Sequence, residues 1–385
     1  MNTIFSFTGA GKIVFGNGAF ERVAEQIREL GGSKPLIVLD KTLALSGLTE
    51  KVSGYFKKAG MDIIIFDKVE GEPPLELADE CSQAAADGSC DVVVGIGGGS
   101  TMDVAKAAAV VTANRGRAVD YLGLNKVPGP GLPTIMIPTT AGTGSEVTFT
   151  SVFIRKDLNK KEGMNSPYLY PTVALLDPEL TLSIPSKVTA TTGIDALCHA
   201  IESYTSIAAS PMSEMVSLEA IELISESLRT CVHNGTDLEA RGQMLLGSLY
   251  AGLGLANAGV TAVHSLSYPL GGTYGIPHGL ANTLLLPAVM NYNLPGALEK
   301  FAIIAEVMGE PTDGLSLNQA AGLAVGAVEN LIDDCGIYDT LETIGIPEED
   351  FPKLAEAAMT VARPLANNPR SVTVEDAIEI YSDAY

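Results

Sequence analysis

The stretch DVVVGIGGGSTMDVAK, residues 91–106, indicates how the first part of this chain folds. A short, apolar and β-branched run ends in three glycines, after which the pattern is that of a helix start. Glycines at the carboxyl end of a strand let the backbone approach a ligand, and the following helix aims free amide groups and the positive end of its dipole at it. The stretch predicts a strand, turn and helix that either cradle a diphosphate or form a plain tight turn. No Gly-Lys-Ser/Thr follows, which excludes a P-loop.

Similar short apolar runs recur on both sides of this unit and alternate with helical patterns. Strands that are apolar throughout are typical of a parallel sheet covered on both faces. From about residue 185 the apolar residues follow helical spacing instead, for example over 215–228 and 321–332. We expect an α/β N-terminal domain with a mostly parallel sheet, residues 1–183, and an all-α C-terminal domain, residues 184–385. The expected strands are 35–39, 62–66, 91–96, 134–137 and 172–176, and the expected helices include 20–30 and 75–87.

Composition narrows the range of partners. The 385 residues include 24 basic and 46 acidic side chains, for a net charge of −22, and such a charge repels nucleic acid and anionic lipid. The longest apolar stretches fall far short of the roughly 18 residues of a membrane span. Residues 1–15 lack the pattern of a signal peptide, and five scattered cysteines favour reduced thiols. We therefore expect a soluble, cytoplasmic protein that binds neither nucleic acid nor a membrane.

Two further features follow predicted strands. Asp40 comes directly after the strand 35–39, where a carboxylate can bind the ribose hydroxyls of an adenosine and repel a 2′-phosphate, or can simply cap a helix. It precedes the glycine run, whereas the usual dinucleotide fingerprint places the acid about 20 residues after it, so the order is not that of a standard Rossmann unit. The loop PTTAGTGSE, residues 138–146, offers hydroxyl and amide groups without bulk, which suits a polar ligand.

Three of the four histidines fall in two glycine-marked segments. Asp195 and His199 are four residues apart and so share one face of a helix. His264 and His278 are separated by a stretch rich in glycine and proline that can fold both rings toward one point. Each histidine alone could be a satisfied core residue, but together the four side chains favour a divalent transition ion such as iron(II) or zinc. His233, at a predicted helix end, is expected at the surface and not as a ligand.

In combination these motifs resemble the iron-containing (group III) alcohol dehydrogenase family over essentially the whole chain. The resemblance rests on GGGSTMDVAK at 97–106, PTTAGTGSEVT at 138–148, GIDALCHAIE at 193–202, and residues 264–287. It implies an α/β domain that binds NAD and a helical domain with one metal ion, usually Fe²⁺ and sometimes Zn²⁺. The ligands it implies are Asp195, His199, His264 and His278, and the cofactor-binding residues are Asp40, Gly97, Gly98, Ser100, Asp103, Thr139, Thr140 and Lys161.

The activity implied by the resemblance is hydride transfer between a short primary alcohol or diol and NAD, in a homodimer or larger homo-oligomer. The first alternative is a metal- and NAD-dependent lyase of the dehydroquinate synthase type, which the ligand set and the scarcity of basic residues near it disfavour. A non-catalytic NAD-binding metal protein is the second alternative.

The chain departs from the family at one site position. Many members carry a second histidine four residues after the first loop ligand, where this chain has Tyr268, a phenol that could move the proton beside the ligand His278. Pro269 directly after it suggests that the helix ends there. Leu255 and Thr150, near the family's substrate pocket, are compatible with a short aliphatic chain.

Overall fold

The computed structural model describes residues 4–158 and 160–385, which form two compact units. One unit is Gly9–Leu182, and the other is Ser183–Tyr385 together with the residues just before Gly9. The amide of Thr8 donates to Oδ1 of Asn257 at 2.7 Å, and Nδ2 of Asn257 donates back to the carbonyl oxygen of Thr8 at 2.8 Å. The first described residues therefore belong with the helical unit, although the sequence alone placed them in the α/β domain.

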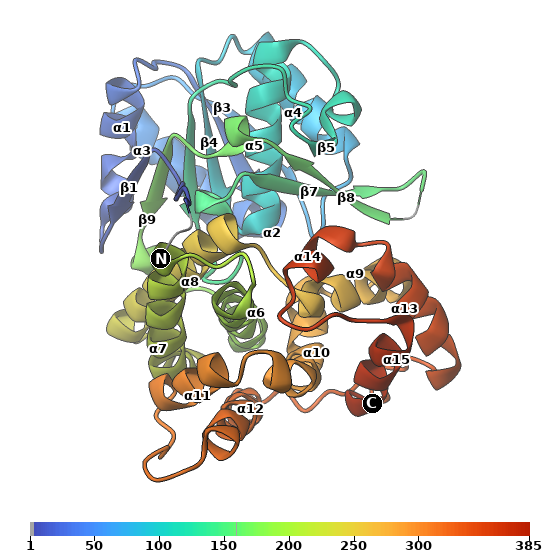
Figure 1. The fold of residues 1–385 in the computed structure, drawn as a ribbon. Helices are drawn as coiled ribbons and strands as arrows, with labels where there is room; N and C mark the ends of the chain where they lie inside the picture. Colours follow the sequence, from blue (N-terminus) through green and yellow to red (C-terminus); the bar gives the residue numbers. More distant parts are fainter. Residues whose placement is uncertain (1–3, 159) are drawn as a thin grey trace. The chain divides into compact units, whose positions relative to one another are not determined.

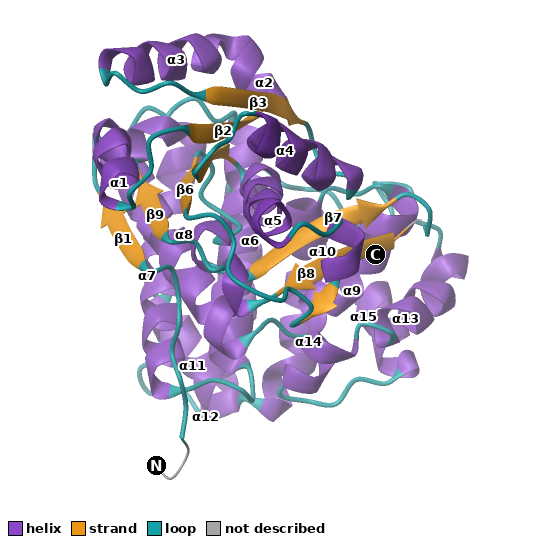
Figure 2. Ribbon diagram, turned by 90° about the horizontal axis from the view of Figure 1, so that it is seen from above, coloured by secondary structure: helices purple, strands orange, loops and turns teal. Residues whose placement is uncertain are grey.

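The first unit is built on a six-stranded sheet in which every neighbouring pair is parallel. All positions of its central strands β4 (Val92–Gly97) and β6 (Thr134–Pro138) are buried, which explains their nearly uninterrupted apolar sequence. Figure 2 shows strands β3, β2, β6, β9 and β1 of this sheet one beside the next. In spatial order the strands are β1 Lys12–Phe15, β9 Val173–Leu176, β6 Thr134–Pro138, β4 Val92–Gly97, β2 Pro35–Asp40 and β3 Ile64–Val69.

Helices cover both faces of this sheet, and alternate residues of one strand enter different cores. Leu36 of β2 packs in one core with residues of α4 and α5, whereas Ile37 packs in another with residues of α1 and α3. The two helix layers can be followed on either side of the strands in Figure 1. The helices of this unit are α1 Val23–Glu29, α2 Lys41–Leu43, α3 Thr49–Lys58, α4 Glu76–Asp87 and α5 Gly99–Asn114.

A second, three-stranded sheet was not predicted. It consists of β5 Gly123–Leu124, β8 Lys160–Asn165 and β7 Thr150–Arg155, of which β7 and β8 are antiparallel. The sequence of β8, KKEGMN, has no apolar run, and strand β1 is only four residues long with mostly exposed positions. Strand β8 therefore lacks the apolar signal by which the other strands could be recognised, and the apolar run within the β1 sequence, KIVF, is only three residues long.

The second unit consists of helices and their connections, and the predicted apolar windows fall within α7 and α12. Helix α7 begins with a capping box at Ser210, and Asp237 caps α8. The prediction that α9 ends near Pro269 was wrong, because the helix continues to Tyr274 with this proline in its interior. The helices are α6 Ser186–Thr205, α7 Pro211–His233, α8 Leu238–Ala258, α9 Ala262–Tyr274, α10 His278–Asn293, α11 Leu298–Val307, α12 Leu317–Asp334, α13 Phe351–Met359, α14 Ala362–Asn367 and α15 Val374–Asp383.

Taken singly, none of the helices in the described part of the chain combines the length and the apolar character that a membrane crossing requires; α8 and α9 meet both criteria only as a pair bent by 102°.

Candidate metal centre and dinucleotide site

The predicted cofactor residues gather at the carboxyl ends of three adjacent strands of the α/β unit. Leu39 of β2 is in register with Ile96 of β4, and Gly97 of β4 is in register with Pro138 of β6. From β2 the chain first adds β3 on one side, and after β4 it adds β6 and β9 on the other. Strand order thus reverses between β2 and β4, and in open parallel sheets ligands bind outside the carboxyl ends at such a switch point.

The glycine run leaves the backbone amide groups at the start of α5 without a capping side chain. Gly98 is the N-cap residue and supplies no side chain to the first amide groups of this 16-residue helix. A Cβ atom on Gly97 would lie 2.5 Å from Oγ1 of Thr101, and one on Gly99 would lie 2.8 Å from Cγ2 of Thr143. Side chains at these positions are therefore excluded, and a backbone cradle of this kind fits a diphosphate.

The two small-residue loops contact each other. The amide of Thr139 donates to the carbonyl oxygen of Gly97 at 2.9 Å, and the side chain of Thr140 lies 3.5 Å from where a Cβ of Gly98 would be. Ser100 lies in the first turn of α5. The structure thus places Gly97 and Gly98, predicted to bind the diphosphate, in contact with Thr139 and Thr140, predicted to make other cofactor contacts. Their roles toward the cofactor stay predictions.

Two of the other predicted cofactor residues already bind protein groups. Asp40 caps α2, where Oδ1 accepts hydrogen bonds from the amides of Thr42 and Leu43 at 2.8 and 3.0 Å. Lys161 lies on β8 and pairs with Glu72. Both bonds of Asp40 use the same oxygen, and a cap of this kind fixes the carboxylate at the strand end without excluding contact with a ribose.

Asp103 belongs to a buried cluster behind the glycine loop. Its Oδ1 accepts from the hydroxyl of Ser145 at 2.6 Å, and its Oδ2 accepts from the amide of Val152 at 2.9 Å. Its predicted contact with the cofactor stays a prediction, and the contacts observed in the structure hold α5 against the second loop and β7.

Sequence reasoning assigned no role to Lys106, which lies at the centre of this cluster. Its Nζ donates to the carbonyl oxygen of Ser145 at 3.0 Å and lies 3.3 Å from Oδ1 of Asp103. Burial lowers the pKa of Lys106, against the opposing effect of the Asp103 and Glu146 carboxylates. Burial also raises the pKa of Glu146 to about 7, and its Oε1 has no hydrogen-bond partner among the described residues.

The four predicted metal ligands converge within the helical unit. Asp195 and His199 lie one turn apart on α6, His264 is the third residue of α9, and His278 is the first residue of α10. One potential ligand atom from each lies within 4.8 Å of the others, and Nε2 of His199 is 3.1 Å from Nε2 of His264. Donor atoms that share one ion at about 2.1 Å each are separated by roughly 3 to 4 Å, so this set fits a divalent transition ion.

The charge state of the centre also suits a cation. Burial raises the pKa of Asp195, but the neighbouring imidazoles, His199 foremost, and a hydrogen bond from Asn282 outweigh it and hold the pKa below its usual value. Nδ2 of Asn282 donates to Oδ1 of Asp195 at 2.7 Å and lies 3.2 Å from the Nε2 atoms of both His264 and His278. An amide nitrogen has two hydrogens to donate, so besides its bond to Asp195 it can donate to one of these two imidazole nitrogens.

A second carboxylate supports the centre, and sequence reasoning gave it no role. Glu202, on α6 three residues after His199, accepts a hydrogen bond from Nδ1 of His264. Burial raises the pKa of Glu202, yet the adjacent His264 and a hydrogen bond from Thr261 hold it below its usual value, so the side chain stays ionised. Its position on the ligand-bearing helix was the available signal.

Tyr268 lies beside the ligands, as its spacing from His264 on α9 predicted. The ring centroid is 6.3 Å from that of His264 and 6.0 Å from that of His278. The ring of Tyr268 therefore lies next to two of the predicted ligands, and its role in proton transfer stays a prediction. Thr150 begins β7 and donates to Oδ1 of Asn165 at 2.8 Å, and Leu255 is a partly buried residue of α8.

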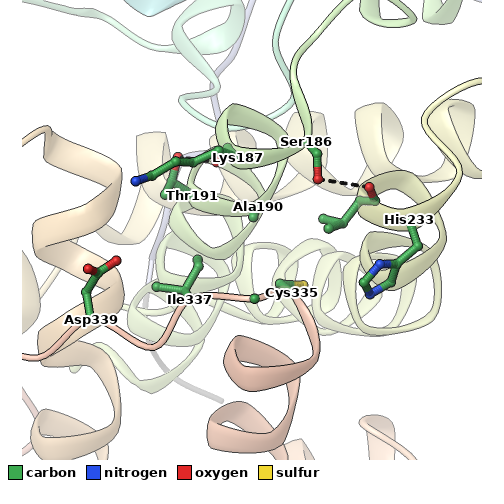
Figure 3. Close-up of a pocket in the computed structure, with 10 residues that line it drawn as sticks. Ser186, Lys187, Ala190, Thr191, His233, Cys335, Ile337 and Asp339 are labelled. Carbon is green, nitrogen blue, oxygen red and sulfur yellow. Dashed lines mark hydrogen bonds between the residues drawn. The ribbon is translucent and has the colours of Figure 1, made fainter.

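The fourth histidine is apart from this centre. His233 ends α7 and is exposed, as expected. Its Nε2 donates to the carbonyl oxygen of Asp334, the last residue of α12, at 2.7 Å. It borders a pocket of about 320 Å³ whose lining includes none of the predicted site residues (Figure 3). Among its lining residues, Ser186 donates a hydrogen bond to the carbonyl oxygen of Val232 at 3.0 Å.

Comparison with known proteins gives consistent results for both units. The sequence model described as "Iron-containing alcohol dehydrogenase" matches residues 10–178, and that described as "Fe-containing alcohol dehydrogenase family, C-terminal" matches residues 189–385. Long-chain-alcohol dehydrogenase 1 of Geobacillus thermodenitrificans is 41% identical over 373 residues, which cover 96% of this chain and 94% of that protein.

Two solved structures extend the likeness to the fold. A 1,3-propanediol oxidoreductase aligns with a TM-score of 0.96 at 37% identity and 100% coverage of both chains. A sulfoacetaldehyde reductase from Bifidobacterium kashiwanohense, solved in complex with NAD⁺, aligns with a TM-score of 0.91 at 30% identity, covering 100% of this chain and 99% of that one. This chain therefore belongs to the iron-containing alcohol dehydrogenase family and has the NAD-dependent activity of an alcohol dehydrogenase or aldehyde reductase.

Proposed function

We propose that Asp195, His199, His264 and His278 hold one divalent ion, Fe²⁺ or Zn²⁺, and that the enzyme interconverts short primary alcohols or diols and their aldehydes. The observation that carries the proposal is the convergence of four ligand atoms within 4.8 Å from three helices. When bound, such an ion acts as a Lewis acid that favours the alkoxide form of an alcohol and polarises an aldehyde.

Residues of the α/β unit are proposed to bind the cofactor. Gly97, Gly98 and Ser100, with Thr139 and Thr140, are proposed to bind the diphosphate of NAD through backbone amides and hydroxyls. The carboxylate of Asp40 is proposed to accept from the adenosine ribose and to disfavour a 2′-phosphate. Asp103 and Lys161 are also proposed to take part in cofactor binding. Asp103 is proposed to do so by holding the loop after β6 in place through its hydrogen bond with Ser145.

Around the alcohol, Tyr268 is proposed to exchange the hydroxyl proton, since its ring lies beside His264 and His278. Leu255 and Thr150 are proposed to border the substrate chain. The preference for a short alcohol or diol is supported by the structural likeness to a 1,3-propanediol oxidoreductase, although another relative is named for long-chain alcohols.

The test is an aldehyde panel with protein stripped of metal and reloaded anaerobically with Fe²⁺ or, separately, with Zn²⁺. NADH oxidation is measured against aldehydes of increasing chain length and against hydroxyaldehydes. We expect turnover that depends on the added ion, is highest for short aldehydes, and is lost in His199→Ala but retained in His233→Ala. Binding of NADH without turnover across the panel would support a non-catalytic metal protein instead.

We also propose a cellular location and an assembly for this enzyme. Five buried, free cysteines are consistent with a reducing, cytoplasmic compartment. The proposed assembly is a homodimer or larger homo-oligomer, which light scattering on the purified protein measures directly.

A further inference from the structure

Glu202 occupies a buried position next to the ligand set but has no ligand role in the proposed function. It is 2% exposed and lies in the last turns of α6, the helix that also carries Asp195 and His199. A carboxylate removed from water in this way is costly unless each of its oxygens is matched by donors.

Both oxygens of Glu202 are matched. Oε1 accepts from the hydroxyl of Thr261 at 2.7 Å and from the amide of Val263 at 2.8 Å, and Oε2 accepts from Nδ1 of His264. An ionised carboxylate has no proton to donate, so Nδ1 of His264 must carry the proton in this contact. In a neutral imidazole the other nitrogen, Nε2, is then left with its lone pair.

The lone pair on Nε2 of His264 is directed at the centre. This atom lies 3.1 Å from Nε2 of His199 and 3.2 Å from Nδ2 of Asn282, an atom that can only donate. We propose that Glu202 is a positioning residue that holds His264 in the tautomer protonated at Nδ1, so that Nε2 is available to the divalent ion. The inference rests on the proposed function, because it presupposes that His264 is a ligand. Carboxylates that orient ligating histidines in this way change metal affinity by about tenfold to a hundredfold when altered.

A purely structural role for Glu202 must be separated from this one. The amide of Val263 belongs to the first turn of α9, where backbone donors lack partners within the helix, so Glu202 also caps that helix. A structural role predicts that removing any donor to this carboxylate lowers stability, with no specific effect on the metal.

The substitution Glu202→Gln distinguishes the two roles with almost no change of shape. If the amide oxygen faces Val263 and Thr261, its NH₂ group faces Nδ1 of His264 and forces that nitrogen to become an acceptor, which moves the proton to Nε2. If the introduced side-chain amide rotates by 180° instead, its NH₂ group faces the backbone N–H of Val263, and two donors then oppose each other. We therefore expect the affinity of the apoprotein for Co²⁺, titrated through its visible d–d absorption, to fall about tenfold to a hundredfold.

Thr261→Val is the matched control. It removes one donor to the same carboxylate but leaves the contact with His264, so it should lower the melting temperature of the apoprotein while Co²⁺ affinity stays near that of the wild type. Equal Co²⁺ affinity and an unchanged spectrum in Glu202→Gln would overturn the inference. Retention of metal in His199→Ala would instead overturn the proposed function.

A measurement on the unsubstituted protein covers the case in which Glu202→Gln does not fold. The chain has four histidines, so ¹⁵N-labelled histidine in the Zn²⁺-loaded protein gives few signals. Two-bond ¹H–¹⁵N correlation reports which nitrogen of each ring is protonated, and the ring signals of His264 are assigned through its backbone resonances in the metal-loaded wild type. We expect a protonated Nδ1 on His264, and a bare Nδ1 would overturn the inference.

Discussion

The ammonium of Lys106 donates a hydrogen bond of 3.0 Å to the carbonyl oxygen of Ser145, which lies in the loop after β6. Lys106 is on α5, the helix that begins at the glycine run, and is 1% exposed. One buried charge thus ties together the two loops that are proposed to bind the cofactor diphosphate.

Replacing Lys106 by Met should lower the free energy of unfolding by about 3 to 5 kcal/mol, because the Asp103 carboxylate and two carbonyl oxygens lose their cation. Chemical denaturation measures the change. Lys68→Met is the control, since Lys68 pairs with Glu80 at the surface and such pairs contribute about 0 to 1 kcal/mol. Equal effects of the two substitutions would mean that the buried cluster does not hold the loops together.

Glu146→Gln should change how stability depends on pH. Burial raises the pKa of the folded-state carboxyl from 4.5 to about 7, so over this range the folded protein keeps a proton that the unfolded chain has lost. The wild type therefore loses stability as pH rises from about 4.5 to about 7, and the substitution removes this loss. We expect the variant's advantage in thermal unfolding to grow over the same range, by up to about 3 kcal/mol. If the stability of the two proteins changed with pH in the same way, the raised pKa of Glu146 would be contradicted.

The main sheet was predictable because its inner strands are apolar at nearly every position, and an apolar run is a local signal. The pairing of Asp195 with His199 was also predictable from a local signal, because residues four apart in a helix lie on the same face. Strand β1 gave a weaker signal, because it is a four-residue edge strand with mostly exposed positions. In the hairpin, β7 has the mixed sequence TSVFIR and β8 has the polar sequence KKEGMN, so the pairing of the two strands is evident only from the structure.

The residues that support the site could not be predicted, because their partners are distant in sequence. Glu202 and His264 are 62 positions apart, and Lys106 and Ser145 are 39 apart. A buried charge in a sequence gives no indication of its partner until the fold brings the two together. Cofactor residues such as Asp40 and Lys161 were recognised from the resemblance, but only the structure shows that each also has a protein partner.

Asp40 offers a test of cofactor choice that preserves the fold. Asp40→Asn keeps a side chain that can cap α2 but removes the negative charge proposed to repel a 2′-phosphate. The wild type should prefer NAD over NADP by a hundredfold or so in kcat/KM, and the variant should narrow the gap. Asp40→Gly should narrow it as well, at some cost in stability. Similar kcat/KM values for both cofactors in the wild type would remove Asp40 from the ribose site.

Tyr268→Phe removes one hydroxyl group beside His264 and His278. If the phenol exchanges the proton, the turnover number should fall by about tenfold to a thousandfold with metal content unchanged. Tyr274→Phe on the same helix is the control, because its hydroxyl binds Asp350 and it should leave turnover unaltered. Turnover and its pH profile are measured for both variants. A wild-type rate and profile in Tyr268→Phe would assign the proton to another group.

The central claim is that Asp195, His199, His264 and His278 bind one divalent ion per chain, and the most direct test is the metal content of purified protein by elemental analysis. The account predicts one ion per chain in the wild type and in His233→Ala, and almost none in His264→Ala or His199→Ala. Full occupancy in either of the last two variants would contradict it.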